Sequence, residues 1–443
     1  MIPRRYLPIR TRIRPILTAV AAASCLAAAA QEAGVETFDR VWQIVNDTHF
    51  DTTFNGVDWP KVRDELRPHA LAASTPDALR GVIRDMLARL GQSHFALVPS
   101  GGVADGDAPA DQSGWPGFDF RLDGSEAIVV AVDPDGPATG KVEAGWAIAS
   151  VGGRTVGQIL SPFDRSRLTA LSRFEAWRTL TAYVRGPIGS QVEIAFDDGS
   201  GTPRGVIVRR DPEPGERVQI GHFPMLAVRT YSRALTTAGG RTVGLIRFNA
   251  WMTPVDGFVQ RAIDEFRTAS GIVIDLRGNP GGLAAMVMGL SGHFLSEPVL
   301  LGRMKTRDGE LRLMANPRRV NASGKAVEPY AGPVAILVDG LTGSASECFT
   351  GGMQSLGRAR VFGTQTMGQA LPALFDRLPN GDILVHAFGD FVTATGDRLE
   401  GRGVIPDVEV AISREALARG RDATLDKALE WVDAIHLRPR QGL

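Results

Sequence analysis

Hydrophobic residues recur at helical spacing between positions 35 and 100. Thr75 followed by Pro76 predicts an N-cap and the first residue of a helix, and Gly91 predicts its end. The apolar positions form two stripes, one with Phe38, Val41, Trp42 and Val45 and one with Leu79, Val82, Ile83, Met86 and Leu90. This part of the chain is expected to be helical.

From 115 to 212 the pattern changes to short alternating strands, such as AIVVAV and QVEIAF, separated by Gly, Pro and Asp. It predicts a small β-rich domain. The preceding polar stretch, residues 101–114, is typical of a linker.

From 215 to 412, near-continuous apolar strands such as GIVIDLRG and PVAILVDG alternate with amphipathic helices. This alternation predicts a mostly parallel sheet with helices on both faces. Two short helices are expected in the tail. The fold class is therefore predicted as α/β, with several domains.

The first thirty residues differ from the rest. Residues 1–14 contain five Arg and no acid, and residues 15–30 form an Ala-rich apolar run that ends in small residues. The pattern predicts a secretory signal peptide over 1–30, and hence a periplasmic or secreted protein with no membrane span after cleavage. Lipidation at Cys25 is the alternative. Cleavage would leave Cys348 as the only thiol, so no internal disulfide is expected.

The composition of the chain excludes some classes of function. A length of 443 residues suggests two or three domains. Lys plus Arg equals Asp plus Glu at 49 each, which argues against a nucleic-acid binder. Only five of the basic residues are Lys. The sequence has no His-Glu-x-x-His motif and no paired-Cys spacing, so neither a metal site nor a cofactor is expected.

The segment VAILVDGLTGSASE places Ser344 where a buried strand turns into a helix. A hydroxyl there lies at the carboxyl end of the sheet, and the amide of Ala345 would point toward an oxyanion. The turn GNPGG can supply the second donor through Gly281 or Gly282. In the alternatives, Ser344 or Ser346 is only a helix cap, or the glycine turn binds a phosphate. The turn lacks the spacing of known nucleotide-binding motifs.

Three motifs in this order, IDLRGNPGG, GSASE with LGRARVFG, and LEGRGVIPDVEV, resemble the tail-specific (C-terminal processing) serine peptidase family and its relative, the tricorn protease. The resemblance extends from about Phe38 to Val432. It implies an N-terminal helical region over 31–100 and a peptidase core of the ClpP/crotonase type over 215–443, with C-terminal helices.

Residues 115–212 are similar to a PDZ domain. The carboxylate-binding turn would be formed by Gly117, Phe118, Asp119 and Phe120, which would bind a peptide C-terminus. The usual glycine-aspartate pair is replaced by Gly145 and Trp146. A PDZ-like domain that only packs against the core is the alternative.

The resemblance also bears on the catalytic base. In the larger branch of the family the base is a Lys 25 residues after the nucleophile, and here that position is Gln369, whose amide cannot take a proton. The tricorn-like branch instead implies His94 as base, supported by Ser93 and Glu400. An unperturbed imidazole titrates at about 6.5, so His94 would serve near neutrality.

The sequence thus predicts a serine endopeptidase acting on proteins or peptides, with an inactive peptide-binding scaffold as the alternative and binding of a small apolar ligand as a weaker one. Substrate and oligomeric state stay open. Glu400 could instead be a surface carboxylate and Ser93 a simple cap, while Cys348 is expected to be a core thiol. The role of His94 rests on its motif, because the chain has six other histidines: His49, His69, His222, His293, His386 and His436.

Overall fold

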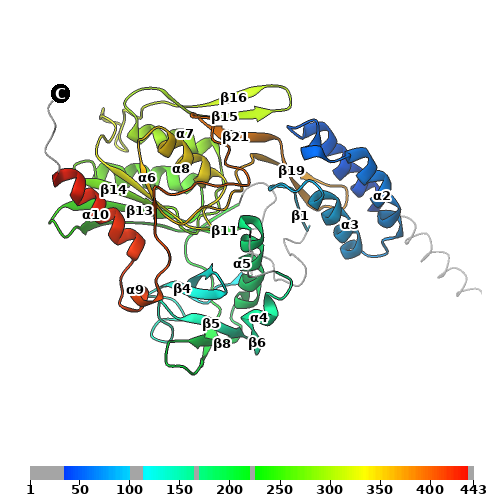
Figure 1. The fold of residues 1–443 in the computed structure, drawn as a ribbon, viewed down its shortest axis with the longest axis horizontal. Coiled ribbons are helices and arrows are strands. Elements are labelled where there is room, and N and C mark those ends of the chain that lie inside the picture. The colour runs from blue at the N-terminus through cyan, green and yellow to red at the C-terminus, as the bar shows by residue number, and fades with distance from the viewer. Residues whose placement is uncertain (1–33, 100–112, 164–168, 220–224, 438–443) are drawn as a thin grey trace, which may run out of the picture.

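A computed structural model of the chain describes residues 34–99, 113–163, 169–219 and 225–437 (Figure 1). The predicted signal peptide, Cys25 and nearly all of the predicted linker lie outside the described residues. Within the described ranges, no helix is both long enough and apolar enough to cross a membrane.

The N-terminal region is helical, as the spacing predicts. Thr75 Oγ1 accepts a hydrogen bond of 3.1 Å from the Ala78 amide, and Pro76 is the first helical residue, so the predicted cap is confirmed. Both predicted stripes pack into one hydrophobic cluster around the fully buried Trp59. The elements are a helix over residues 34–48, η1 (Phe54–Gly56), α2 (Trp59–Ala72) and α3 (Pro76–Ala88).

A short sheet attaches these helices to the rest of the molecule. Strand β1 (Ala96–Val98) pairs antiparallel with β20 (Ile383–Ala387), which pairs with β19 (Ala373–Arg377). Residues 93 and 94 lie just before β1, separated from it by Phe95. They are therefore held at the junction between the N-terminal helices and the C-terminal half of the chain.

The middle segment, residues 113–212, contains an antiparallel sheet in the order β3-β4-β5-β8-β9, with β6 beside β5. Helix α5 packs on it through Ala176, Leu180 and Val184. This helix was not predicted, because the alternating strand pattern on either side of it was extended across the whole segment. The elements are β2 (Ser113–Gly114), β3 (Phe118–Asp123), β4 (Glu126–Val132), β5 (Ala147–Val151), β6 (Arg154–Thr155), α4 (Val156–Ile159), α5 (Ala170–Val184), β7 (Gly186–Pro187), β8 (Gln191–Asp197) and β9 (Arg204–Arg209).

The C-terminal half is built on a six-stranded sheet in the order β12-β13-β14-β17-β18-β22. Only the β12–β13 pair is antiparallel, so the predicted mostly parallel sheet is confirmed. Its strands are β12 (Thr230–Thr236), β13 (Thr242–Phe248), β14 (Gly271–Asp275), β17 (Val334–Val338), β18 (Arg360–Gly363) and β22 (Val408–Glu409).

Alternate side chains of these strands face opposite layers. Val334, Ile336 and Val338 of β17 pack toward the layer of helices α6 (Thr253–Glu265), α7 (Ala285–Ser291) and α8 (Ala345–Ser355). Ala335 and Leu337 pack toward α10 (Ala423–Leu437). Figure 1 shows α10 on the opposite side of the sheet from these three helices. Burial on both faces explains why these strands are almost continuously apolar.

Some elements differ from the prediction. A second antiparallel sheet, ordered β16-β15-β21, and the hairpin β10–β11 were not predicted, and the two strands of the hairpin have only three residues each. In the tail, α9 (Arg414–Ala418) is short, but α10 has 15 residues, so the expectation of two short helices was wrong for α10. The remaining bounds are β10 (Glu216–Val218), β11 (Leu226–Val228), η2 (Gly292–Phe294), β15 (Val299–Thr306), β16 (Glu310–Ala315) and β21 (Gly389–Thr393).

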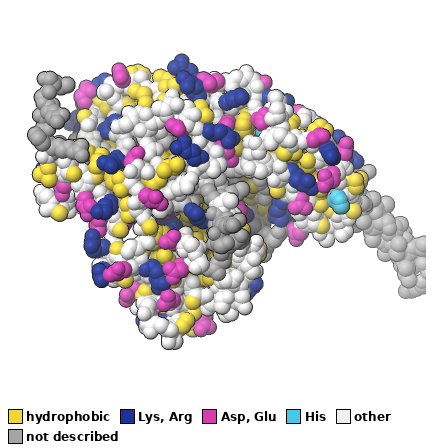
Figure 2. Space-filling view, viewed as in Figure 1, with side chains coloured by type: hydrophobic (Ala, Val, Ile, Leu, Met, Phe, Trp, Pro, Cys, Tyr) yellow, Lys and Arg dark blue, Asp and Glu magenta, His cyan; other side chains and the backbone are white. Residues whose placement is uncertain are grey.

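Charges are mixed on the surface. On the face drawn in Figure 2, acidic and basic side chains are interspersed over all parts of the molecule. This distribution agrees with the balanced composition.

Candidate active site

Ser344 occupies the turn between strand β17, which ends at Val338, and helix α8, which begins at Ala345. Its backbone has φ +51° and ψ −120°, a conformation that side-chain-bearing residues rarely adopt. Two hydrogen bonds hold it there, because the Ser344 amide donates to the Gln369 carbonyl at 2.8 Å and to Glu347 Oε2 at 3.1 Å. The hydroxyl group therefore sits on a strained and tightly fixed turn.

The neighbouring serine and cysteine are less suited to react. Ser346 is fully buried, and its Oγ accepts a hydrogen bond of 2.7 Å from Trp251 Nε1. Cys348 is also buried, and burial raises the pKa of its thiol well above the usual value. Ser344 is only half-buried, so it is the nucleophile candidate that substrate can reach.

The glycine turn that follows strand β14 lies directly against Ser344. The carbonyl of Asn279 accepts the Gly343 amide at 3.0 Å, which ties this turn to the nucleophile turn. A Cβ atom on Gly281 would lie 2.6 Å from Ser344 Cβ, and Gly281 has φ +105°. Only glycine fits at this position.

The proposed oxyanion donors differ in their availability. The Gly281 amide donates to Asn279 Oδ1 at 3.0 Å, so this N–H group is already engaged. The amides of Gly282 and Ala345 have no hydrogen-bond partner among the described residues. The amides of Gly282 and Ala345 are therefore the two predicted donors that are not engaged.

The other predicted residues form a second cluster. Ser93 and Glu400, 307 positions apart, are both buried and make two hydrogen bonds: the Ser93 amide to Glu400 Oε1 at 2.8 Å and Ser93 Oγ to Glu400 Oε2 at 2.9 Å. His94 Nδ1 lies 2.8 Å from Ser93 Oγ. The Ala370 amide donates to Glu400 Oε2 at 3.0 Å and completes the cluster.

This network assigns the protons on His94. An ionised Glu400 can only accept hydrogen bonds, so the single proton of the Ser93 hydroxyl is used in the hydrogen bond to Glu400. Ser93 Oγ must then accept from His94, which places the imidazole proton on Nδ1. The lone pair of Nε2 is left available as a base.

Burial determines the charge state of the cluster. His94 is half-buried, and desolvation lowers its pKa from 6.5 to about 4, so the ring is neutral at pH 7. Desolvation raises the pKa of Glu400, while the hydrogen bonds from Ser93 and Ala370 oppose that rise. A neutral imidazole is the form that can accept a proton.

A short loop joins the two clusters. Gln369 binds the Ser344 amide through its carbonyl, and the next residue, Ala370, binds Glu400 through its amide. Within the described residues, no hydrogen bond connects Ser344 Oγ directly to His94. The structure thus brings the predicted residues to one region, linked through residues 369 and 370.

Sequence reasoning missed Glu347, which organises this loop. Its buried carboxylate accepts hydrogen bonds from the amides of Ser344, Gly368 and Gln369, and a short one from Thr366 Oγ1. Desolvation raises the pKa of Glu347 to about 7 despite these four donors. Its position as third residue of a helix after a serine is the signature of a capping box, which could have revealed it.

Gln369 lies beside Ser344, at the position compared in the sequence with a lysine base. Its carbonyl holds the Ser344 amide, and its side-chain nitrogen is buried without a hydrogen-bond partner in the described part of the chain. An amide cannot act as a base, so the side chain leaves proton transfer to another group.

The predicted peptide-binding turn packs closely against the segment that follows β4. Gly117 has φ +88°, and a Cβ atom there would lie 2.7 Å from Pro137 Cδ. Asp119 forms an ion pair of 3.5 Å with Arg229. Trp146, at the position where the PDZ resemblance predicts an aspartate, is buried against Phe196. This substitution therefore contributes to the hydrophobic core of the middle segment.

A cleft of about 1150 Å³ extends from the middle segment to the glycine turn. Asp119 and Trp177 of the middle segment line it, and so do Gly278 and Pro280 of the glycine turn. Among the described residues, no group of three or more His, Cys, Asp or Glu side chains could hold a metal ion.

Two stretches of the chain match known protein families. Residues 242–410 match peptidase family S41, and residues 35–88 match the tricorn protease C1 domain. The first match contains Ser344, the glycine turn and Glu400, and the second covers most of the N-terminal helices.

Curated relatives agree with both matches. A chloroplastic C-terminal processing peptidase of Tetradesmus obliquus is 25% identical over 390 residues, which cover 84% of this chain and 76% of the relative. Tricorn protease homolog 1 of Streptomyces coelicolor is 25% identical over 405 residues, which cover 89% of this chain. The matched region spans only 34% of that relative's length.

Solved structures share the fold. A photosystem II D1 C-terminal processing protease has a TM-score of 0.57 and 22% identity, with 88% of this chain and 98% of that chain covered. Mature CPAF has a TM-score of 0.59 and 14% identity, with 91% and 96% covered. At these identities the likeness concerns the fold alone.

Proposed function

Because this chain belongs to peptidase family S41 and is a serine-type peptidase, we propose that it is a secreted or periplasmic endopeptidase with Ser344 as nucleophile and His94 as general base. The proposal divides the chain into a signal peptide over 1–30, an N-terminal helical region over 31–100, a PDZ-like domain over 115–212 and a ClpP/crotonase-like core over 215–443.

In the proposed reaction, Ser344 Oγ attacks the carbonyl carbon of the scissile peptide bond while His94 Nε2 takes its proton. The bond between carbon and the leaving nitrogen then breaks, and His94 returns the proton to the amine. A water molecule, activated in the same way, hydrolyses the acyl-enzyme and releases Ser344. Ser93 and Glu400 keep the imidazole oriented.

The negative charge that develops on the carbonyl oxygen needs donors. Ala345 is the first residue of α8, and its amide benefits from the helix dipole. We assign the second donor to Gly282, because the Gly281 amide is engaged with Asn279. Two such preorganised donors are the usual composition of an oxyanion hole.

The observation that carries the proposal is the buried contact between Ser93 and Glu400, which are 307 positions apart. This contact fixes His94 in the tautomer that a general base requires. The loop residues 369 and 370 connect it to the Ser344 turn. Burying a carboxylate, a hydroxyl and an imidazole in one hydrogen-bonded row costs free energy of folding, which a catalytic role would explain.

We further propose that Gly117, Phe118, Asp119 and Phe120 bind the C-terminus of a peptide. Strand β3, which contains the last three of these residues, is an edge strand of its sheet, so it can accept an added strand. The cleft that runs from Asp119 to Gly278 offers a path from this edge to the glycine turn.

Labelling with a fluorophosphonate probe, together with hydrolysis of an unfolded protein, tests the assignment of Ser344. The wild-type chain should be labelled and active, whereas Ser344→Ala should lose both properties. Ser355→Ala is the matched control, since Ser355 ends the same helix and only bonds the Gly352 carbonyl. Labelling that persists in Ser344→Ala would place the nucleophile elsewhere, and an unlabelled wild type would favour a peptide-binding scaffold.

A further inference from the structure

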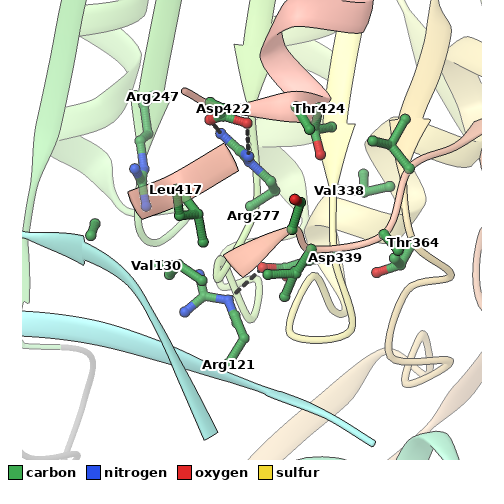
Figure 3. Close-up of a pocket in the computed structure, with 16 residues that line it drawn as sticks. Arg121, Val130, Arg247, Arg277, Val338, Asp339, Thr364, Leu417, Asp422 and Thr424 are labelled. Carbon is green, nitrogen blue, oxygen red and sulfur yellow. Dashed lines mark hydrogen bonds and ion pairs between the residues drawn. The ribbon is translucent and has the colours of Figure 1, made fainter. Parts of the chain in front are cut away.

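Polar contacts join the N-terminal region and the middle segment to the C-terminal half of the chain. The middle segment is joined through the ion pair of Arg121 with Asp339, which Figure 3 shows between strand β3 and the loop after β17. The N-terminal region is held by Arg307, in the turn between β15 and β16. Its Nη1 donates to the carbonyls of Asn46 at 2.9 Å and His49 at 3.3 Å. This contact fixes the backbone of His49, a residue that the proposed reaction does not use.

The side chain of His49 is fully buried, and its contacts reach both sides of the dipeptide Ser93–His94. His49 Nε2 donates to Gln92 Oε1 at 2.9 Å, since an amide oxygen can only accept. On the other side of the dipeptide, the Phe95 ring stacks on the imidazole, with centroids 5.4 Å apart and an interplanar angle of 9°. One buried ring therefore contacts the residue before Ser93 and the residue after His94.

The imidazole of His49 has little freedom to move. Its Nδ1 lies 2.8 Å from the Asp51 carbonyl oxygen and 3.1 Å from the Asp51 amide nitrogen. The Phe50 ring also stacks on it, with centroids 4.8 Å apart. Burial lowers the pKa of His49, so the ring is mostly neutral near pH 7 and adds no charge to this cluster. His49 is therefore a rigid and uncharged support.

The dipeptide between these contacts needs support, because the backbone of His94 is strained. Its φ is +59°, a conformation that costs free energy in a residue with a side chain and persists only where the surroundings impose it. Glu400 fixes Ser93 through the amide and the hydroxyl group. The contacts of His49 act on the residues at both ends of the dipeptide, so they help to impose this conformation.

The same aromatic group touches the loop that joins the two clusters of the site. Phe50 packs with Leu371 and Ala387 in one hydrophobic cluster, and Phe95 packs against this cluster. Leu371 directly follows residues 369 and 370, which bind the Ser344 turn and Glu400. The support around His49 is thus in contact with the loop that leads to the nucleophile.

We infer that His49 is a positioning residue, which holds the turn of Ser93 and His94 in the conformation that directs His94 toward Ser344. The inference rests on the proposed function. Without the contact to Gln92 the turn relaxes, His94 leaves the geometry needed for proton transfer, and more water reaches its ring. Misplacement of a reacting group by about 1 Å can lower a rate about a hundredfold.

His49→Phe tests the inference, because it keeps an aromatic ring in the stack and removes the donor to Gln92. In the full chain, kcat on a short peptide substrate should fall about tenfold to a hundredfold with KM nearly unchanged. Hydrogen exchange over residues 93–96 should become faster. The acid limb of kcat/KM should move from near pH 4 toward 6.5, since desolvation is what lowers the pKa of His94.

Further variants separate positioning from folding. His49→Gln, whose side-chain amide can donate to Gln92, should recover part of the lost rate. Gln92→Ala removes the acceptor and should lower kcat as His49→Phe does. The double variant should be no slower than the slower single variant, because both changes act through one contact. His69→Phe, on the exposed side of α2, is the matched control and should behave as the wild type.

Wild-type kcat, exchange and pH profile in His49→Phe would overturn the inference, and so would losses of kcat that add up in the double variant. If His49→Phe does not fold, Gln92→Ala decides by the same three measurements. A wild type without activity would refute the proposed function, while the exchange comparison would still decide whether His49 holds the turn.

Discussion

At the scale of single residues, backbone conformation marks the proposed site. Only four residues other than glycine have a positive φ in the described part of the chain, and two of them are His94 and Ser344. The others, Phe54 and Asn55, lie together in one turn. Such conformations cost free energy and persist where the surroundings impose them. Their coincidence with the proposed base and nucleophile is evidence independent of sequence motifs.

Replacing Ser344 should separate strain from chemistry. Both Ser344→Ala and Ser344→Gly should be inactive, but Ser344→Gly should be the more stable by about 1 kcal/mol, because glycine adopts φ +51° without a steric penalty. Chemical denaturation of the two variants measures the difference. Equal stabilities would show that the turn is not strained.

The choice of base can be tested by comparing two variants. His94→Ala should reduce kcat nearly as much as Ser344→Ala, because members of one catalytic unit are not additive. Gln369→Ala should cost far less, since the contact that Gln369 makes to Ser344 uses its backbone carbonyl. Steady-state kinetics on one peptide decide the order. The reverse order would contradict the assignment of His94 as the base.

The pH dependence of the reaction follows from His94. Because desolvation lowers the pKa of His94 to about 4, the base should stay deprotonated well below neutrality. The acid limb of kcat/KM is therefore expected near pH 4, measured on a peptide without titratable groups. A midpoint near 6.5 would contradict a desolvated imidazole.

The same shift affects stability. Below pH 6.5 the unfolded chain binds a proton at His94 that the folded chain refuses, so the free energy of unfolding should fall as the pH drops from 6.5 toward 4. Glu347, with its pKa raised to about 7, acts in the opposite direction over an overlapping range. The contribution of His94 is therefore read from the difference between wild type and His94→Ala.

At the scale of elements, the N-terminus of helix α8 and the loop over residues 366–369 form one unit around Glu347. Each carboxylate oxygen accepts two hydrogen bonds, which leaves no acceptor position unused. The unit presents Ser344 on one side and leads into Ala370 and Glu400 on the other. The carboxylate thereby connects the nucleophile turn to the support of the base.

Glu347→Gln should therefore damage both stability and rate. The amide group would place an NH2 against amide donors, leaving at least one of them unpaired in a buried site, at a cost of about 1–3 kcal/mol. The midpoint temperature of thermal unfolding and kcat should both fall. Glu430→Gln on the exposed side of α10 is the control, and equal behaviour of the two variants would argue against this unit.

At the scale of the whole molecule, the proposed site is assembled from three regions. The N-terminal helices, the middle segment and the C-terminal half each have their own hydrophobic cluster. Ser93 and His94 come from the first region, Ser344 and Glu400 from the third, and Arg121 links the second to them. In Figure 1 the first and second regions lie on different sides of the third.

Binding of a peptide by the middle segment, away from Ser344, involves the whole molecule. If residues 117–120 bind a terminal carboxylate, an apolar peptide with a free C-terminus should bind Ser344→Ala protein more tightly than its amidated twin, by about tenfold to a hundredfold. Isothermal titration calorimetry with both peptides measures the ratio. Equal affinities would limit the middle segment to a packing role.

Much of the architecture follows from local sequence. Apolar periodicity determines the N-terminal helices and the buried parallel strands, because burial on one face or two faces leaves a direct trace in the pattern. The motif around Ser344 predicts the turn between β17 and α8. The local pattern of these segments is sufficient to predict them, since each of these features depends on residues close together in the chain.

Other features depend on residues far apart, and only the tertiary structure decides them. No local pattern reveals that Arg121 meets Asp339, and the grouping of Ser93 with Glu400 was implied only by the family resemblance, while their contact is seen only in the structure. Helix α5 was missed because it lies between segments with a strand pattern, and its packing on the sheet is seen only in the structure. The pKa of His94 likewise depends on burial by the whole fold, which a single sequence position does not encode.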